Sequence, residues 1–260
     1  MSALAARVRA GERGALARAI SVLEDGGPGA GALRAELERT RPWTAAVVGV
    51  TGPPGAGKST LIGRMASALV ASGRRVALLL VDPSSPLTGG AVLADRVRMR
   101  RVAGEGDRLF VRSVGSRGQS GGLSAGTRAI VAALDAWGAD VVVIETVGAG
   151  QADVDVCRVA DRTVLVCPPG LGDELQAMKA GLMEVADLFV VNKADRPGAK
   201  ATTSSLRDAG RGGADRTRRR VLETVATSGD GVDALVAELD RLLDGVRERA
   251  SAPAAHPGAT

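Results

Sequence analysis

The sequence predicts an α/β fold, an open and mostly parallel sheet of about seven strands with helices on both faces, plus a short N-terminal helical appendage. Short runs of Val, Leu and Ile alternate with longer amphipathic stretches along most of the 260 residues. Nearly continuous apolar strands are typical of a sheet covered on both faces, and strand–helix alternation implies parallel crossovers. A composition of 45% hydrophobic and 24% charged residues excludes wholesale disorder.

Residues 1–42 are predicted to form a helical extension ahead of the main domain. Apolar residues at helical spacing predict a first helix there: Leu4, Val8, Leu16, Ile20 and Leu23. Gly26-Gly-Pro-Gly29 interrupts the pattern, and a second helix is expected around Leu33–Leu37. The main domain is expected over residues 43–249, followed by a disordered tail over 250–260.

Within the main domain, seven apolar runs are predicted as strands: Ala46–Val50, Val76–Val81, Leu109–Val111, Val141–Ile144, Thr163–Val166, Leu188–Val191 and Arg220–Val225. The intervening and final stretches are predicted as helices: Ser59–Ala71, Ala91–Ala103, Ser124–Trp137, Glu174–Met183, Ala199–Ala209 and Val232–Arg249. Ligands of open α/β sheets bind at the carboxyl ends of the strands. Functional residues are therefore expected in the loops that follow the strands.

Several classes of protein are excluded by composition. No apolar stretch approaches the roughly 20 residues of a membrane span, and the N-terminus lacks the apolar region of a secretory signal. We therefore expect a cytoplasmic protein that does not enter a membrane. Two cysteines, Cys157 and Cys167, and a single histidine, His256, nearly exclude disulfide frameworks, His/Cys metal clusters and histidine catalysis.

Nucleic acid is not expected as a partner either. The chain has four aromatic residues and no Tyr, so it lacks the stacking platforms of single-strand binders. The net charge is +5, with basic runs at Arg96–Arg101 and Arg216–Arg220. These runs are interpreted as solvated faces, although a basic surface for nucleic acid or a membrane is the alternative.

The loop after the first predicted strand matches the phosphate-binding pattern G-x-x-x-x-G-K-[ST] and precedes a predicted helix. The residues expected to bind phosphate are Gly52, Pro53, Pro54, Gly55, Ala56, Gly57, Lys58, Ser59 and Thr60. Backbone N–H groups of such a loop surround phosphate oxygens, and the helix N-terminus adds partial positive charge. Lys58 is predicted to reach the β- and γ-phosphates and Ser59 to ligate Mg²⁺. A glycine-rich turn that merely starts a helix is the alternative.

Carboxylates that could complete a Mg²⁺ site follow two other strands. Asp82 comes directly after an apolar strand, and Asp95 lies in the helix predicted next. Glu145 ends the run Val141–Ile144 in a Walker-B-type arrangement. A turn or helix-capping role for Asp82 and a solvated position for Asp95 remain the alternatives.

The residues after Glu145 are candidates for sensing the γ-phosphate. Gly148 can bring its N–H close to a phosphate because it has no Cβ. A loop of this kind can order with a triphosphate and relax after hydrolysis. Gln151 could position the attacking water, and no residue is an obvious general base.

A motif after the strand Leu188–Val191 predicts recognition of guanine. The carboxylate of Asp195 can accept two hydrogen bonds from guanine N1–H and the 2-amino group, and adenine offers neither donor. The Lys193 side chain can cover the base, and Asn192 can tie the loop to its neighbours. Asn192 is the one asparagine of the chain, and Lys58 and Lys193 are two of its four lysines, so chance matches are improbable.

Five stretches together resemble the MeaB/ArgK/MMAA family of G proteins, within the SIMIBI class of P-loop GTPases: Val50–Thr60, Asp82–Met99, Arg117–Ser124, Glu145–Asp155 and Asn192–Asp195. Thr224–Gly231 resembles the last nucleotide loop of the family and so places Val225 and Ala226 near the base. Gly11–Glu24 resembles its leading helices. The resemblance covers residues 4–245.

What the resemblance implies is a metallochaperone-like GTPase that binds GTP or GDP with Mg²⁺. Family members assist an adenosylcobalamin-dependent acyl-CoA mutase, typically methylmalonyl-CoA mutase, in loading and protecting its cofactor. Their hydrolysis is slow alone and faster with the partner. Lys58, Gly148 and Gln151 are the residues expected to act in hydrolysis.

Two departures from the family pattern qualify this expectation. Gln151–Asp155 reads Q-A-D-V-D where the family typically has Q-S-E-T-E, in the switch that reads the partner. The family usually continues into a helical dimer arm, whereas here Leu235–Arg249 and a short tail remain, so a monomer or weak homodimer is expected. The alternatives are a nucleotide-gated binding module without significant hydrolysis, a transport-associated ATPase or kinase, and a metallochaperone GTPase for urease or hydrogenase. The last would need Cys/His ligands at metal spacing, which the sequence lacks.

Overall fold

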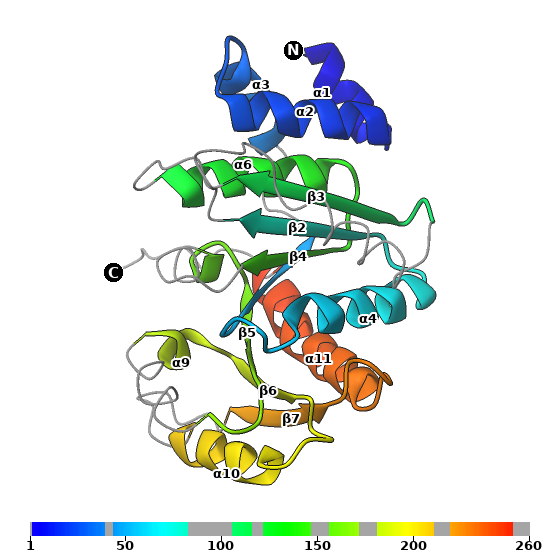
Figure 1. The fold of residues 1–260 in the computed structure, drawn as a ribbon. Helices are drawn as coiled ribbons and strands as arrows, with labels where there is room; N and C mark the ends of the chain where they lie inside the picture. Colours follow the sequence, from blue (N-terminus) through cyan, green and yellow to red (C-terminus); the bar gives the residue numbers. More distant parts are fainter. Residues whose placement is uncertain are drawn as a thin grey trace, which may run out of the picture.

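A single seven-stranded sheet forms the centre of the molecule, in the strand order β3-β2-β4-β1-β5-β6-β7 (Figure 1). The computed structural model describes residues 2–39, 44–82, 106–115, 122–146, 156–171, 181–210 and 219–251. The strands are β1 (Ala46–Thr51), β2 (Val76–Asp82), β3 (Leu109–Gly115), β4 (Val141–Thr146), β5 (Arg162–Cys167), β6 (Leu188–Asn192) and β7 (Arg220–Thr224). All their pairings are parallel, which confirms the predicted fold class.

All seven predicted strands are present, with small differences at their ends. β3 continues to Gly115, four residues beyond its predicted end, because Arg112–Gly115 stay paired with β2. β7 ends at Thr224 instead of Val225, which forms an isolated antiparallel bridge with Asp230 in the following loop.

Helices cover both faces of the sheet. In the main domain they are α4 (Lys58–Ala71), α6 (Gly122–Ala136), α9 (Leu182–Val185), α10 (Ala199–Ala209) and α11 (Val232–Ser251). α4 and α11 pack on one face, whereas α6 packs on the other beside β1–β4 and α9 and α10 pack beside β5 and β6. The predicted helices 59–71, 124–137, 199–209 and 232–249 are thus confirmed, with shifts at their ends. The predicted helix 91–103 lies outside the described residues, as does most of 174–183.

The N-terminal segment contains three helices, so the prediction of two is wrong. They are α1 (Ser2–Arg9), α2 (Arg13–Asp25) and α3 (Ala30–Glu38). Gly11 lies between the first two with φ +81°, a left-handed conformation that glycine tolerates and that ends α1. The apolar spacing continues across this turn because both helices direct their apolar residues, such as Val8 and Leu16, into the same core.

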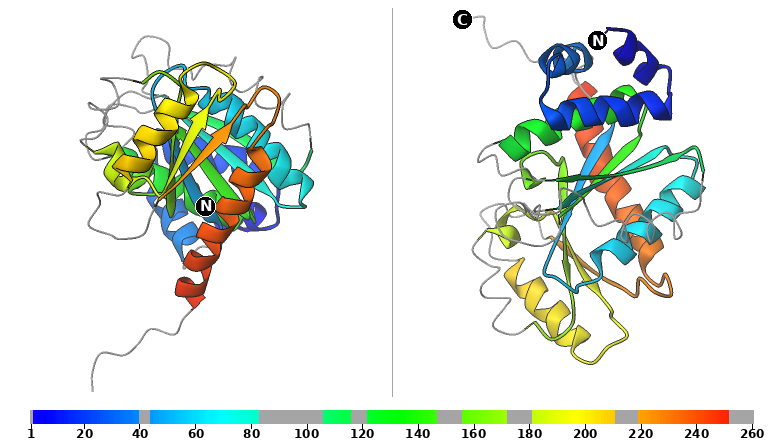
Figure 2. Two further views of the ribbon diagram at one scale, coloured as in Figure 1. Left: turned by 90° about the horizontal axis from the view of Figure 1, so that it is seen from below. Right: turned by 45° about the horizontal axis from the view of Figure 1, so that its top comes forward.

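The three N-terminal helices pack mainly on α6 and share its core with the sheet. Figure 2 shows them stacked over α6. Leu16, Ile20 and Leu33 are fully buried in the same cluster as Ile130 of α6 and Ile144 of β4. The division into a helical extension over residues 1–42 and a main domain over residues 43–249 stays a prediction.

The amino ends of three pairs of neighbouring strands are joined by the same type of hydrogen bond. Asp140, Asp161 and Asp187 each precede a strand, and each carboxylate accepts the backbone N–H of a residue near the start of the adjacent strand: Arg75, Val47 and Thr163, at 2.7–2.8 Å. Burial raises the pKa of Asp161, although the hydrogen bond from Val47 opposes this effect. These contacts fix the edge of the sheet where the strands begin, opposite to the loops that follow their carboxyl ends. Among the helices of the described residues, none has the length and apolar character needed to cross a bilayer.

Candidate nucleotide-binding site

The loop between β1 and α4 has the backbone of a phosphate-binding loop. Its three glycines, Gly52, Gly55 and Gly57, all have positive φ angles. A Cβ on Gly52 would lie 2.1 Å from the Val166 carbonyl oxygen, and one on Gly57 would lie 2.4 Å from Asn192 Nδ2. Residues larger than glycine are therefore excluded at both positions, because the loop packs closely against Val166 of β5 and Asn192 of β6.

Lys58 begins α4 and turns its side chain back over this loop. Its Nζ donates to the carbonyl oxygens of Gly52, at 2.7 Å, and Pro53, at 3.1 Å, and the residue is only 6% exposed. The ammonium group thus lies at the centre of the loop, where phosphate oxygens would meet it. The N-terminus of α4 adds its partial positive charge at the same place.

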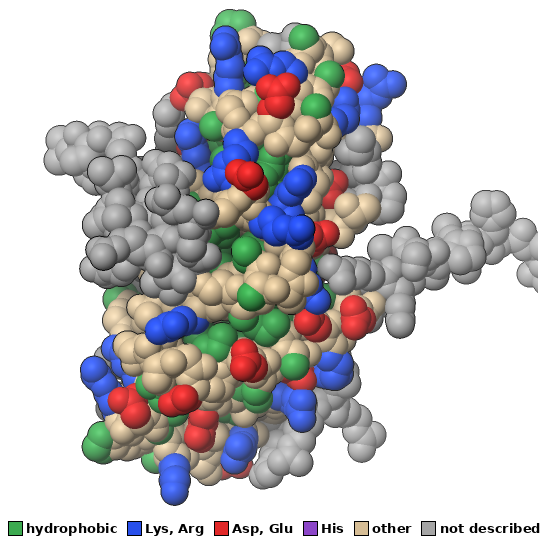
Figure 3. All heavy atoms as spheres, turned by 90° about the vertical axis from the view of Figure 1, so that its right-hand side faces the viewer, with side chains coloured by type: hydrophobic (Ala, Val, Ile, Leu, Met, Phe, Trp, Pro, Cys, Tyr) green, Lys and Arg blue, Asp and Glu red, His purple; other side chains and the backbone are tan. Residues whose placement is uncertain are grey.

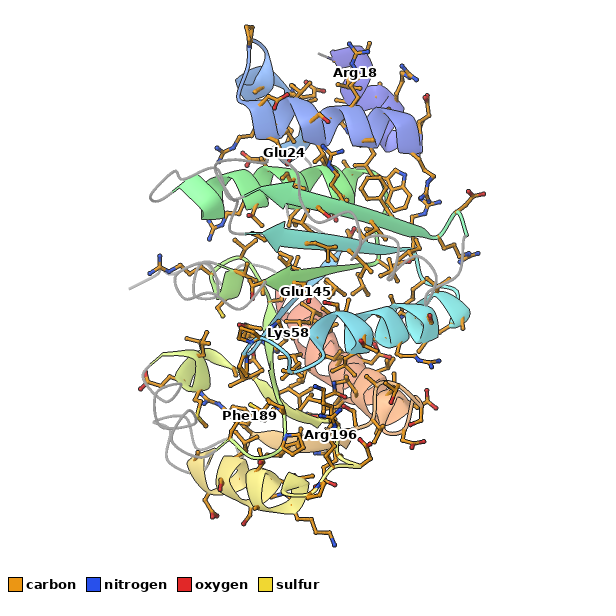
Figure 4. All side chains as sticks on the ribbon, in the orientation of Figure 1. Arg18, Glu24, Lys58, Glu145, Phe189 and Arg196 are labelled. Atoms are coloured by element: carbon orange, nitrogen blue, oxygen red, sulfur yellow. The ribbon has the colours of Figure 1, made fainter. Side chains whose placement is uncertain are left out.

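Ser59 and Glu145 come together from α4 and β4. Ser59 Oγ donates to Glu145 Oε1 at 2.7 Å, and Glu145 is 6% exposed at the carboxyl end of its strand. Figure 4 shows Lys58 and Glu145 close together at this edge of the sheet. The structure therefore brings together the loop lysine, a hydroxyl and a carboxylate that were predicted independently. Their roles as ligands stay predictions.

Asn192, at the end of β6, joins three loops of the site. Its Nδ2 donates to the Ala56 carbonyl oxygen at 2.9 Å. Its Oδ1 accepts from Thr224 Oγ1 at 3.2 Å and from the Ala226 N–H at 3.1 Å. Asn192 is 1% exposed, and its three hydrogen bonds join the end of β6 to the phosphate-binding loop, to the end of β7 and to the loop after β7. Thr224 is a contributor that the sequence analysis did not identify.

Lys193 and Asp195 lie in the turn after Asn192. Lys193 has φ +61°, unusual for a residue other than glycine, and its Nζ donates to the Gly55 carbonyl oxygen at 2.6 Å. The Lys193 side chain thus crosses the phosphate-binding loop. Asp195 is exposed, so its carboxylate is accessible to a ligand.

The loop after β7 contacts the site through the Ala226 N–H, which donates to Asn192; that Val225 and Ala226 lie near the base stays a prediction. Val225 N–H donates to the Asp230 carbonyl oxygen at 2.9 Å and closes the loop on itself. Ala226 is 3% exposed. Arg64 of α4 also contacts this loop, a contact that no sequence motif indicated.

The other predicted site residues fall outside the described part of the chain. Asp95, Gly148 and Gln151 are among them, and so is the side chain of Asp82. The Asp82 backbone ends β2, which pairs with β4 so that Leu80 lies opposite Glu145. Asp82 therefore ends its strand at the same edge of the sheet as Glu145.

Among the described residues, no group of three or more His, Cys, Asp or Glu side chains could hold a metal ion. Cys167 ends β5 near the site, but burial raises the pKa of its thiol to about 12. The thiol therefore stays protonated near neutral pH and is a poor metal ligand.

A phosphate-binding loop after β1 and an Asn-Lys-x-Asp turn after β6, on a parallel sheet of this order, define a P-loop GTPase. The chain belongs to the family described as methylmalonyl-CoA mutase-associated GTPase MeaB, whose model matches residues 16–254.

Similar proteins support this assignment. A protein of Pyrococcus abyssi named as a candidate GTPase is 45% identical over 236 residues, which cover 88% of this chain and 72% of that protein. GTPase ArgK of Escherichia coli is 44% identical over 192 residues, covering 73% of this chain and 58% of that protein. The crystal structure of a LAO/AO transport system kinase matches with a TM-score of 0.74 and 30% identity, over 95% of this chain and 79% of that one.

Proposed function

We propose that this protein binds GTP with Mg²⁺, hydrolyses it slowly, and assists an adenosylcobalamin-dependent acyl-CoA mutase, namely methylmalonyl-CoA mutase, in loading and protecting its cofactor. The family supports a guanine-nucleotide hydrolase and gives the mutase as the associated enzyme. The observation that supports nucleotide binding most directly is the set of hydrogen bonds of Asn192. They connect the Asn-Lys-x-Asp turn to the phosphate-binding loop and to the loop after β7.

The residues fit a Mg²⁺ ion held jointly by protein and phosphates. The hydroxyl of Ser59 and the carboxylate of Glu145 both offer oxygen atoms as metal ligands, and Ser59 Oγ lies 2.7 Å from Glu145 Oε1. Such an ion is typically bound by one or two protein oxygens together with substrate phosphates. When bound, Mg²⁺ would neutralise charge that develops on the phosphates during transfer. Asp82 and Asp95 are further candidates for its outer ligands.

The chain's own groups would position the nucleotide and stabilise its charge. Lys58 supplies a buried ammonium group at the phosphates, and the backbone N–H groups of residues 55–60 would surround them. Asp195 accepts from the guanine edge, and Lys193 covers the loop. Positioning and electrostatic stabilisation account for most of phosphoryl-transfer catalysis, so the absence of a general base in the motifs is compatible with slow hydrolysis. Gln151 is proposed to orient the attacking water.

Coupling to the mutase is proposed to run through residues 148–155, which follow Glu145. Gly148 would contact the γ-phosphate, and Asp153 and Asp155 would contact the partner. A ligand shifts partner binding only through differential interaction with two states, so the γ-phosphate must change the affinity for the mutase. We further propose that the protein works in the cytoplasm as a monomer or weak homodimer. Neither of its two cysteines forms a disulfide, which is compatible with a reducing compartment.

The test is GTP turnover of the wild type and of a variant carrying Asp153→Ala and Asp155→Ala, each with and without methylmalonyl-CoA mutase. We expect the mutase to accelerate the wild type more than the variant, with similar GDP affinity in both. Equal turnover in all four samples would contradict the proposed partner while leaving the GTPase assignment intact.

Two further variants test the phosphate and metal sites. Lys58→Ala should abolish GTP turnover, and Glu145→Ala should raise the Mg²⁺ concentration that turnover requires. Unchanged Mg²⁺ dependence would remove Glu145 from the metal site.

A further inference from the structure

We propose that Arg64 positions the loop after β7 and thereby sets the affinity for the guanine base, without taking part in hydrolysis. This inference rests on the proposed function, because it assumes that the loop after β7 faces the base. Arg64 lies on α4, less than two helical turns beyond Ser59. The helix that carries the phosphate-binding residues thus also contacts the base side of the site.

The contact is made by two nitrogen atoms of one guanidinium group. Arg64 Nε donates to the Ala226 carbonyl oxygen at 3.2 Å, and Nη2 donates to the Thr227 carbonyl oxygen at 2.7 Å. Because both acceptors belong to successive peptide units, the planar guanidinium fixes their relative orientation. Hydrogen bonds with a charged donor are stronger than neutral ones.

Ala226 is consequently held from both sides. Its N–H donates to Asn192 Oδ1 at 3.1 Å, while its carbonyl oxygen accepts from Arg64. The loop is closed locally by Val225 N–H to the Asp230 carbonyl oxygen and by Gly229 N–H to the Val225 carbonyl oxygen. These local bonds shape the loop. In the described residues, the side-chain hydrogen bonds that connect Ala226 to the rest of the site are those with Asn192 and Arg64, beside its apolar packing against α4. Arg64 therefore helps to set the distance between this loop and α4.

A guanine nucleotide spans that distance, since its phosphates lie at the start of α4 and its base lies against the β7 loop. Displacement of the loop would weaken contacts to the base and leave contacts to the phosphates in place. The expected signature is a loss of guanine affinity with an unchanged maximal rate. A purely structural role in α4 would instead weaken both.

The experiment compares Arg64→Ala, Arg64→Lys and wild type by calorimetric binding of GDP and ADP and by steady-state GTP turnover. For Arg64→Ala we expect the Kd for GDP to rise about tenfold, the size of effect that one lost charge-assisted hydrogen bond gives. The Kd for ADP and kcat at saturating GTP should hardly change, while KM rises. Arg64→Lys, which keeps the charge and can reach one carbonyl, should recover part of the affinity.

Arg18→Ala is the matched control, because Arg18 is also an exposed helical arginine and lies on α2. It should leave both Kd values unchanged. An unchanged Kd for GDP in Arg64→Ala, or an equal loss for GDP and ADP, would overturn the role of Arg64. A wild type that binds ADP as tightly as GDP would instead contradict the proposed function itself. Since alanine favours helix, α4 should stay folded, which a thermal unfolding curve checks.

Discussion

At the scale of single residues, Asn192 connects parts of the chain that are remote in sequence. Its amide group reaches the phosphate-binding loop on one side and the β7 loop on the other. An amide can donate and accept at once, so no smaller or purely acidic side chain could make all three hydrogen bonds. The single asparagine of the chain therefore holds the site's loops in register.

Asn192→Ala should lower the free energy of unfolding by about 2–4 kcal/mol, because it leaves the Ala56 carbonyl, the Thr224 hydroxyl and the Ala226 N–H unpaired in a buried place. It should also raise the Kd for GDP. Urea unfolding at equilibrium measures the first effect and calorimetry the second. A variant as stable as wild type would show that water replaces these hydrogen bonds.

Asp195→Asn should weaken GDP binding by about 2–4 kcal/mol and shift preference toward xanthosine diphosphate. The amide can donate where the carboxylate accepted, which suits the keto oxygen of xanthine. Calorimetry with both nucleotides measures the switch. Asp233→Asn, an exposed aspartate in the first turn of α11, is the control and should change neither affinity. If Asp195→Asn kept its preference for GDP, the predicted base contact would be wrong.

At the scale of elements, α11 is attached to β7 by a buried carboxylate. Glu238 of α11 is 4% exposed and accepts from Arg220 of β7 at 2.5 Å and from Arg241 of α11 at 2.6 Å. The hydrogen bond from Arg241, aided by that from Arg220, lowers the pKa of Glu238 below its ordinary value, against the opposing effect of burial. The charged form is therefore favoured in the folded state.

The stability that Glu238 contributes should depend on pH in a predictable direction. A carboxylate with a lowered pKa stabilises the fold fully above its ordinary value of 4.5, and this stabilisation is lost as the pH falls through the lower pKa of the folded state. Glu238→Gln should cost about 1 kcal/mol at pH 7, since both arginines are largely exposed. The cost should shrink at acidic pH, as urea unfolding from pH 7 to 3 would show. A cost independent of pH would contradict this account.

At the scale of the whole molecule, the N-terminal helices are attached to the main domain at several points. Trp137 Nε1 donates to the Gly11 carbonyl oxygen at 3.0 Å, and Arg112 of β3 forms an ion pair with Glu24 of α2 at 2.6 Å. The Arg75 guanidinium lies 4.9 Å from the centre of the Trp137 ring.

Figure 3 shows basic and acidic side chains interspersed over one face of the molecule. The described part of this face is therefore not a continuous basic surface.

These contacts predict that the N-terminal helices and the sheet unfold together. Leu33→Ala, at a fully buried position in α3, should lower the free energy of unfolding by about 2–5 kcal/mol. Loss of far-UV circular dichroism and release of a fluorescent guanine nucleotide should still coincide. If release followed a separate, later transition, the helices and the main domain would be independent folding units.

The strands and the phosphate-binding loop could be predicted from the sequence alone, because both depend on local patterns. Apolar runs identify buried strands wherever they lie, and Gly52–Ser59 contains within eight residues the backbone freedom and side chains that phosphate binding requires. The break at Gly11 was missed because apolar spacing continues across the turn when two helices share a core. Only the tertiary structure brought Ser59 to Glu145, Asn192 to Ala56, and Arg64 to Ala226, which is 162 residues away. Such contacts depend on the order of strands in the sheet and on helix packing, which no local pattern contains.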